Sequence, residues 1–174
     1  MDGGAAPERA IWALVQSLPG PDVLRKDFNE RRADPRILSL VSPTCDQCLA
    51  GLRVVVDTIG DARGITVLVL WLDMIAGDGP EAAARMSSEL ARNSGVKHYW
   101  EGDGWPVSSR VRSLLGIGAY DPKQSAWDVH VLYGQGIEWS GVAPPSPTAV
   151  AYNTLDDMSV GKRLSATVIR RWLG

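Results

Sequence analysis

The feature that most constrains the fold is an almost unbroken apolar run over residues 65–72, in which Thr66 is the one polar residue. A strand with one face in water alternates apolar and polar residues, whereas a strand covered on both faces is apolar throughout. Residues 37–41 form a shorter run of the same kind, with Ser39 inside it. Two such strands predict an α/β fold in which a sheet has helices on both sides.

The only two cysteines, Cys45 and Cys48, stand three residues apart, between the first apolar run and a helix-like segment over residues 49–59. Free backbone N–H groups and the helix dipole stabilise a thiolate at a helix N-terminus, and the thiolate is the nucleophilic form of cysteine. Cys45 is expected in the first turn and Cys48 one turn deeper. The pair is therefore the candidate reactive site.

The remaining pattern supplies the other elements. Helices are predicted over residues 7–18, 21–32, 80–93, 107–115 and 164–173, and strands over residues 96–100 and 127–133. The turn at residues 134–136 is expected to bring residues 137–139 back as a hairpin partner. We expect an N-terminal helical extension, residues 1–36, and a single domain over residues 37–174, with an insertion over residues 77–124 before the C-terminal hairpin.

Charge and hydropathy exclude several function classes. The chain has 18 Lys and Arg against 20 Asp and Glu, a formal net charge of −2, and no basic block, so nucleic acid is not an expected partner. No apolar run is long enough to span a bilayer, and no membrane partner is expected. The first residues lack a basic segment followed by an apolar one, which predicts a cytoplasmic location. Thiols there stay mostly reduced, which favours a reactive dithiol over a structural disulfide.

The order of these elements, with Ser-Pro-Thr-Cys-x-x-Cys at residues 42–48 between a strand and a helix, resembles the thioredoxin superfamily. It looks closest to the divergent bacterial thioredoxin-like proteins that carry this motif. The resemblance covers about residues 37–172. It implies a thioredoxin-like fold, in which a central mixed sheet is flanked by helices. It also implies the activity of a thiol–disulfide oxidoreductase or a thiol-dependent reductase.

The resemblance also implies roles for particular residues. Cys45 would be the nucleophile, Cys48 the resolving thiol of a redox-active disulfide, and Thr44, Ala126 and Trp127 would contact the substrate. It implies no cofactor. The partners would be a disulfide or small-molecule thiol substrate and a reducing partner protein.

Three positions depart from the family pattern. Asp46 places a carboxylate beside the nucleophile, which disfavours the thiolate. The acid that thioredoxins carry six residues before the first cysteine falls on Ser39 here, which removes the usual proton acceptor for Cys48. The family's cis-proline falls on Ala126, just before Trp127, so the wall that guides a substrate backbone is expected to be open.

A metal centre is the competing interpretation of the site. Soft thiolates suit copper or zinc, and Cys45 and Cys48 could be joined by His130, which lies in the strand expected to run near them. Packing in the sheet with a hydrogen-bond partner is the favoured interpretation of His130, and His98 is expected at the surface or in a loop. The chain would then be a copper- or zinc-binding protein or a metal-dependent enzyme. A third alternative is a thioredoxin-like binding module whose thiols are incidental.

Overall fold

The computed structural model describes residues 14–60, 64–90, 95–102, 104, 106–117, 121–153 and 161–174. Within these residues, seven strands form one mixed sheet in the order β1-β4-β3-β2-β5-β6-β7. Strands β1, β4, β3 and β2 are mutually parallel, β5 is antiparallel to β2 and β6, and β7 is parallel to β6. Their bounds are β1 Val15–Ser17, β2 Arg36–Val41, β3 Thr66–Leu72, β4 Val96–Gly102, β5 Val129–Tyr133, β6 Ala149–Tyr152 and β7 Lys162–Arg163.

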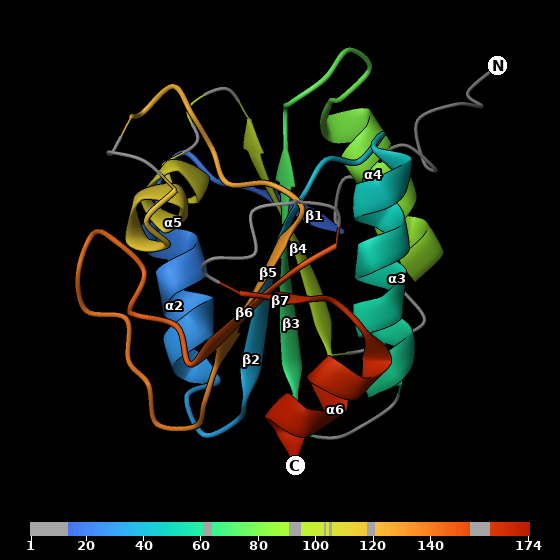
Figure 1. The fold of residues 1–174 in the computed structure, drawn as a ribbon. Coiled ribbons are helices and arrows are strands. Elements are labelled where there is room, and N and C mark those ends of the chain that lie inside the picture. The colour runs from blue at the N-terminus through green and yellow to red at the C-terminus, as the bar shows by residue number, and fades with distance from the viewer. Residues whose placement is uncertain are drawn as a thin grey trace, which may run out of the picture.

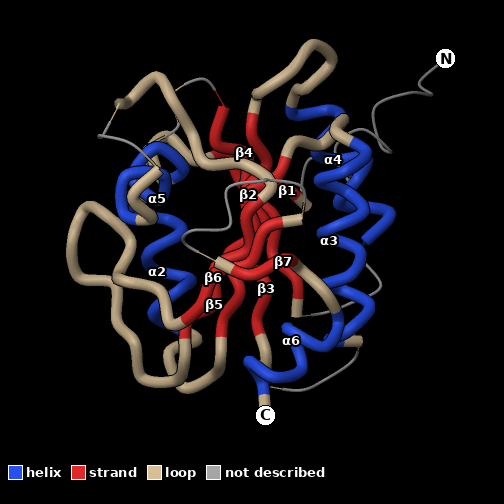
Figure 2. The backbone as a smooth tube through the Cα atoms, in the orientation of Figure 1, coloured by secondary structure: helices blue, strands red, loops and turns tan. Residues whose placement is uncertain are grey.

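Helices cover both faces of this sheet, which confirms the predicted α/β fold. Helices α2 (Asp22–Glu30) and α5 (Ser108–Leu114) lie on one face, and α3 (Asp46–Ile59), α4 (Pro80–Leu90) and α6 (Ala166–Leu173) lie on the other (Figure 1). The strands run as a layer between the two groups of helices (Figure 2). Each face has its own apolar cluster: Leu24 and Phe28 of α2 belong to one, and Leu52 of α3 and Ile169 of α6 belong to the other.

The two central strands are buried along their whole length, as the apolar runs predict. Every residue of β2 and of β3 is buried. The two strands pair in parallel from Arg36–Thr66 to Val41–Trp71, so their carboxyl ends lie at the same edge of the sheet. Helix α3 begins directly beyond that edge, which places the cysteine pair there.

The N-terminal segment differs from the prediction. Residues 15–17, expected at the end of a helix, form strand β1, which pairs in parallel with β4 from Val15–His98 to Ser17–Trp100. The rest of the predicted helix, residues 7–13, lies outside the described residues. Strand pairing is not local, so the spacing of apolar residues alone could not distinguish a short edge strand from a helix end. The division of the chain into an N-terminal extension, residues 1–36, and a domain over residues 37–174 stays a prediction.

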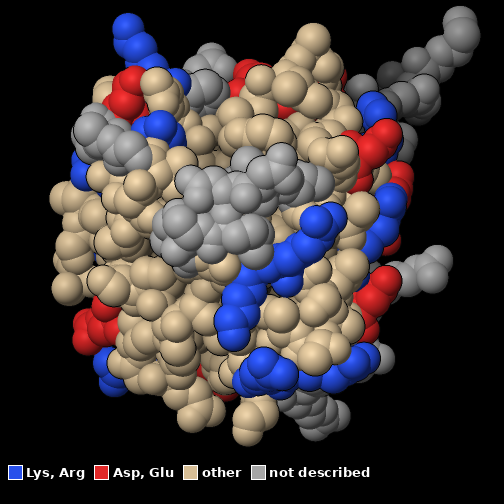
Figure 3. Space-filling view, in the orientation of Figure 1, with Lys and Arg blue, Asp and Glu red and all other residues tan. Residues whose placement is uncertain are grey.

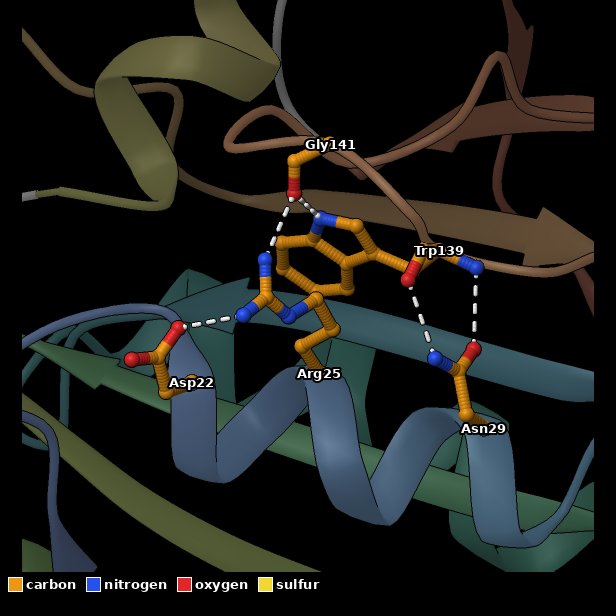
Figure 4. Close-up of polar contacts among 5 residues, drawn as sticks. All are labelled: Asp22, Arg25, Asn29, Trp139 and Gly141. Carbon is orange, nitrogen blue, oxygen red and sulfur yellow. Dashed lines mark hydrogen bonds and ion pairs between the residues drawn. The ribbon is translucent and has the colours of Figure 1, made fainter.

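The predicted hairpin over residues 137–139 is wrong, because β5 pairs instead with β6, which follows after a loop over residues 134–148. In that loop Trp139 is buried against α2. Asn29 of α2 replaces a strand partner, since its amide donates to the Trp139 carbonyl and accepts from the Trp139 N–H, both at 2.9 Å (Figure 4). Arg25 and the Trp139 indole both donate to the Gly141 carbonyl.

A buried arginine completes this arrangement. The Arg36 guanidinium, at the start of β2, donates to the carbonyls of Phe28, Ile137 and Gly134 at 3.2, 2.9 and 2.7 Å and lies over the Phe28 ring at 4.1 Å. A fixed fork of N–H donors can satisfy several carbonyls that have left the sheet. The side chain therefore binds a carbonyl of α2 and two carbonyls of the loop over residues 134–148, among them that of Ile137, which the predicted hairpin would have paired with backbone.

The insertion over residues 77–124 contains α4, β4 and α5. It widens the sheet, because β4 pairs with β3 on one side and with β1 on the other. The predicted helices in this segment are confirmed over Pro80–Leu90 and Ser108–Leu114, and residues 91–93 of the first lie outside the described residues. The predicted strand is confirmed, with β4 two residues longer than expected. The insertion therefore builds one side of the sheet.

Surface charge is mixed on the face drawn in Figure 3. A basic strip lies over β7 and α6, where the chain has Lys162, Arg163, Arg170 and Arg171. Charges on the short edge strand β7 discourage pairing with a strand of another molecule. Among the described residues, no helix is both long and apolar enough to cross a membrane.

Candidate functional site

The first cysteine caps the helix that follows it. Cys45 is the N-cap residue of α3, with extended backbone angles (φ −87°, ψ 109°), and its Sγ accepts a hydrogen bond from the Cys48 N–H at 3.4 Å. This N–H belongs to the first helical turn, where backbone donors have no partner within the helix. The Cys45 side chain is half-buried. The Cys45 sulfur is therefore both hydrogen-bonded to the helix N-terminus and accessible.

The second cysteine has the opposite environment. Cys48 is fully buried and packs with Val41 and Leu52 in the apolar cluster beneath α3. Burial raises the pKa of the Cys48 thiol well above its ordinary value, and a hydrogen bond with Cys45 and the charge of Asp128 act in the same direction. Cys48 is therefore a protonated thiol at neutral pH, so the two cysteines are chemically distinct.

A carboxylate that the sequence analysis missed ties together the segments in front of Cys45. Asp78, in the loop between β3 and α4, accepts five hydrogen bonds. Burial alone would raise its pKa, but bonds from Thr44, Met74, Ile75 and Ser42 outweigh burial and lower the pKa below the ordinary value. The carboxylate is thus charged at neutral pH. The available signal was an aspartate in Gly77-Asp78-Gly79-Pro80 at the carboxyl end of the strand next to β2.

The expected packing of His130 in the sheet is confirmed. Its Nδ1 lies 2.9 Å from Ser39 Oγ, in a register that pairs the two residues across β2 and β5. Burial lowers the pKa of His130 to about 3, so the ring is neutral. Its Nε2 faces α3 at Gly51, where a Cβ would lie only 3.2 Å away. Ser39 therefore holds a neutral imidazole beneath the cysteine helix.

His98 contradicts the expectation of a surface or loop position. It is buried in β4 and stacks on Trp71, with ring centroids 5.9 Å apart and planes 10° from parallel. Burial lowers the pKa of His98 to about 4. A single histidine in a weakly alternating segment gave no sign of this stacking partner.

The predicted substrate contacts have three different environments. Thr44 is exposed, Ala126 is buried with its N–H donating to the Ser108 carbonyl at 3.1 Å, and Trp127 is half-buried. Cys45 and Trp127 pack at the border of the same apolar cluster. Asp46 is exposed in the first turn of α3, where solvent screens its charge. The role of the three contacts stays a prediction.

The three-ligand metal alternative finds no support in the residues that are placed. Among them, no group of three or more His, Cys, Asp and Glu side chains could hold a metal ion. His130 turns Nδ1 to Ser39 and packs its other nitrogen against Gly51, so its ring is held by the sheet and the helix. Cys45 and Cys48 are free thiols, and His130 is not needed to hold them together.

The order of elements defines the class of fold. A strand leads into Cys-x-x-Cys and a helix, a parallel strand follows, and an antiparallel pair and a final helix close the chain. The protein has a thioredoxin-like α/β fold that carries a Cys-x-x-Cys pair at the edge of its sheet, as the sequence resemblance implied.

The chain is similar to solved structures of this kind. One is a secreted Mycobacterium tuberculosis disulfide oxidoreductase homologous to E. coli DsbE, with 12% identity, 83% of each chain covered and a TM-score of 0.49. Another is MTB DsbF in its mixed oxidized and reduced forms, with 14% identity, 85% of this chain and 82% of that chain covered and a TM-score of 0.49. A third is a thioredoxin-like protein in the oxidized form, with 12% identity, 80% and 78% covered and a TM-score of 0.45. No protein-family model and no curated protein matches the sequence.

Proposed function

We propose that the protein is a thiol–disulfide oxidoreductase in which Cys45 is the nucleophile and Cys48 the resolving thiol. The observation that carries the proposal is the contrast between the two sulfur atoms. Cys45 is accessible and receives an N–H from the first turn of α3, whereas Cys48 is buried and held protonated. Only the first is available to an external disulfide, and only the second is protected from one.

The reaction proceeds in two exchanges. The Cys45 thiolate attacks one sulfur of a substrate disulfide, the S–S bond breaks, and the departing thiolate takes a proton from water. Cys48 then attacks Cys45 Sγ, forms the Cys45–Cys48 disulfide, and gives its proton to the second substrate thiolate as it leaves. The substrate gains two electrons and two protons. A reducing partner protein with its own dithiol returns them to the enzyme.

The class of reaction is tested by equilibration with mixtures of reduced and oxidised glutathione, followed by acid quenching and alkylation. Intact mass then gives the fraction of protein with both thiols free. The proposal predicts one two-electron transition between dithiol and disulfide in the wild type. A wild-type protein that keeps both thiols free at every glutathione ratio would contradict it. The Cys48→Ala variant is the control and should form no intramolecular disulfide.

The alternative metal site and the expected location each make a prediction of their own. A centre of two thiolates binding copper or zinc predicts near-stoichiometric metal in the purified protein, and release of that metal by Cys45→Ser. The cytoplasmic location predicts that the dithiol is mostly reduced in cells. Metal analysis of the purified protein tests the first prediction, and thiol trapping in a cell extract tests the second.

A further inference from the structure

Asp78 connects the ends of the two central strands immediately in front of the nucleophile. Its Oδ1 accepts from Ser42 Oγ at 2.8 Å, from the Thr44 N–H at 3.2 Å and from Thr44 Oγ1 at 2.6 Å. Its Oδ2 accepts from the N–H groups of Met74 and Ile75 at 2.8 and 3.0 Å. One oxygen thus holds the segment that follows β2, and the other holds the loop that follows β3.

Three of these five bonds come from Ser42 and Thr44, two of the three residues before Cys45. An aspartate that only closed its own loop would bond to Met74 and Ile75 alone, two short contacts within the same turn. The bonds to Ser42 and Thr44 instead cross 36 and 34 residues of sequence. Thr44 is joined to Cys45 by a peptide bond. The position of Thr44 therefore fixes where the extended N-cap backbone of Cys45 begins.

Two effects of this carboxylate on Cys45 oppose one another. Its negative charge disfavours a nearby thiolate. Its bonds hold the turn in which Cys45 Sγ meets the Cys48 N–H, and this contact favours the thiolate. The negative charge of Asp78 is partly offset by its five hydrogen-bond donors. Solvent near the Thr44 contacts also screens this charge. The geometric effect is therefore expected to dominate.

We propose that Asp78 is a positioning residue for Cys45: by holding Ser42 and Thr44 against the β3–α4 loop, it keeps the Cys45 sulfur on the first-turn N–H and so keeps this thiol reactive. The inference rests on the proposed function and deepens it, since it names the group that positions the nucleophile. It concerns the reactivity of one thiol. A failure of the protein to exchange disulfides would therefore leave its test intact.

The test is the rate at which iodoacetamide alkylates Cys45 in the reduced full-length protein, followed by peptide mass over a range of pH. Asp78→Asn keeps the size of the side chain but removes the charge and places an NH2 group against backbone donors. Thr44→Val keeps the charge and removes only the Oγ1 bond. Both variants are expected to shift the pH–rate profile to higher pH, with alkylation at pH 7 slowed by about tenfold in Asp78→Asn and less in Thr44→Val.

A control separates positioning from general loosening of the fold. Asn29→Ala removes two hydrogen bonds on the opposite face of the sheet (Figure 4) and should lower stability while leaving the Cys45 profile unchanged. Faster alkylation in Asp78→Asn would mean that charge dominates and would overturn the proposal. An unchanged profile in either site variant, or an equal slowing in Asn29→Ala, would also overturn it. If Asp78→Asn does not fold, Thr44→Val decides alone.

Discussion

Gly51, in the middle of α3, gives the sharpest prediction about how the cysteine helix is held. An Ala at this position would place its Cβ 3.0 Å from Asn153 Cβ and 3.2 Å from His130 Nε2. Helix propensity alone predicts that Gly51→Ala stabilises the protein by about 1 kcal/mol. The packing predicts the opposite, because α3 approaches β5 and the end of β6 more closely than a methyl group allows.

The packing effect is expected to exceed the propensity effect. Neither neighbour can move away freely, since His130 is fully buried and bonded to Ser39, and Asn153 donates to the Gln47 carbonyl at 2.6 Å. Overpacking of a tight interior typically costs about 1–3 kcal/mol. After the gain in propensity is subtracted, we expect Gly51→Ala to lower the free energy of unfolding by about 1 kcal/mol.

Urea unfolding followed by tryptophan fluorescence measures this difference, with the midpoint and slope compared between variants. Gly20→Ala is the matched control, because nothing lies within 4 Å of its added Cβ. This control should leave the free energy of unfolding unchanged or raise it by about 0.5 kcal/mol, because alanine lowers the conformational entropy of the unfolded chain. A Gly51→Ala variant as stable as the wild type, or more stable, would refute the packing argument.

The buried histidines predict a loss of stability in mild acid. Burial lowers the pKa of His98 to about 4 and of His130 to about 3, whereas each titrates near 6.5 in an unfolded chain, so below that pH the unfolded state binds protons that the folded state excludes. His98→Phe, which keeps an aromatic ring on Trp71, should remove up to about 3 kcal/mol of the decline between pH 6.5 and pH 4, and equal pH slopes in the variant and the wild type would contradict this. His130→Gln should flatten the same decline at a cost in stability at pH 7, and a variant that keeps the full acid sensitivity would show that His130 does not contribute to it.

The parts of the fold that the sequence predicts are those fixed by local chemistry. An unbroken apolar run has few alternatives to a strand covered on both faces, so β2 and β3 were predictable. The apolar stripe of α3 and the cysteine pair at its start were predictable for a related reason, since the helix must place one face on that sheet. The sequence order therefore placed the cysteine pair at the correct edge of the sheet.

The errors share a different cause, which is pairing between distant segments. Residues 137–139 have a strand-like pattern, but Asn29 and Arg36 supply their partners, and no local pattern reveals a side chain about a hundred residues away. Strand β1 depends on the free edge of β4 in the same way. Asp78 was missed because a loop aspartate is ordinary in sequence, and its bonds to Ser42 and Thr44 exist only once β2 and β3 are aligned.

The division of labour between the two sulfur atoms is tested most directly by exposing Cys48→Ser and Cys45→Ser to the same peptide disulfide and mapping any adduct by mass. The account predicts that Cys48→Ser accumulates a stable mixed disulfide on Cys45, while Cys45→Ser stays unmodified because Cys48 is fully buried. An adduct that forms on Cys48 as readily as on Cys45, or on neither, would contradict it.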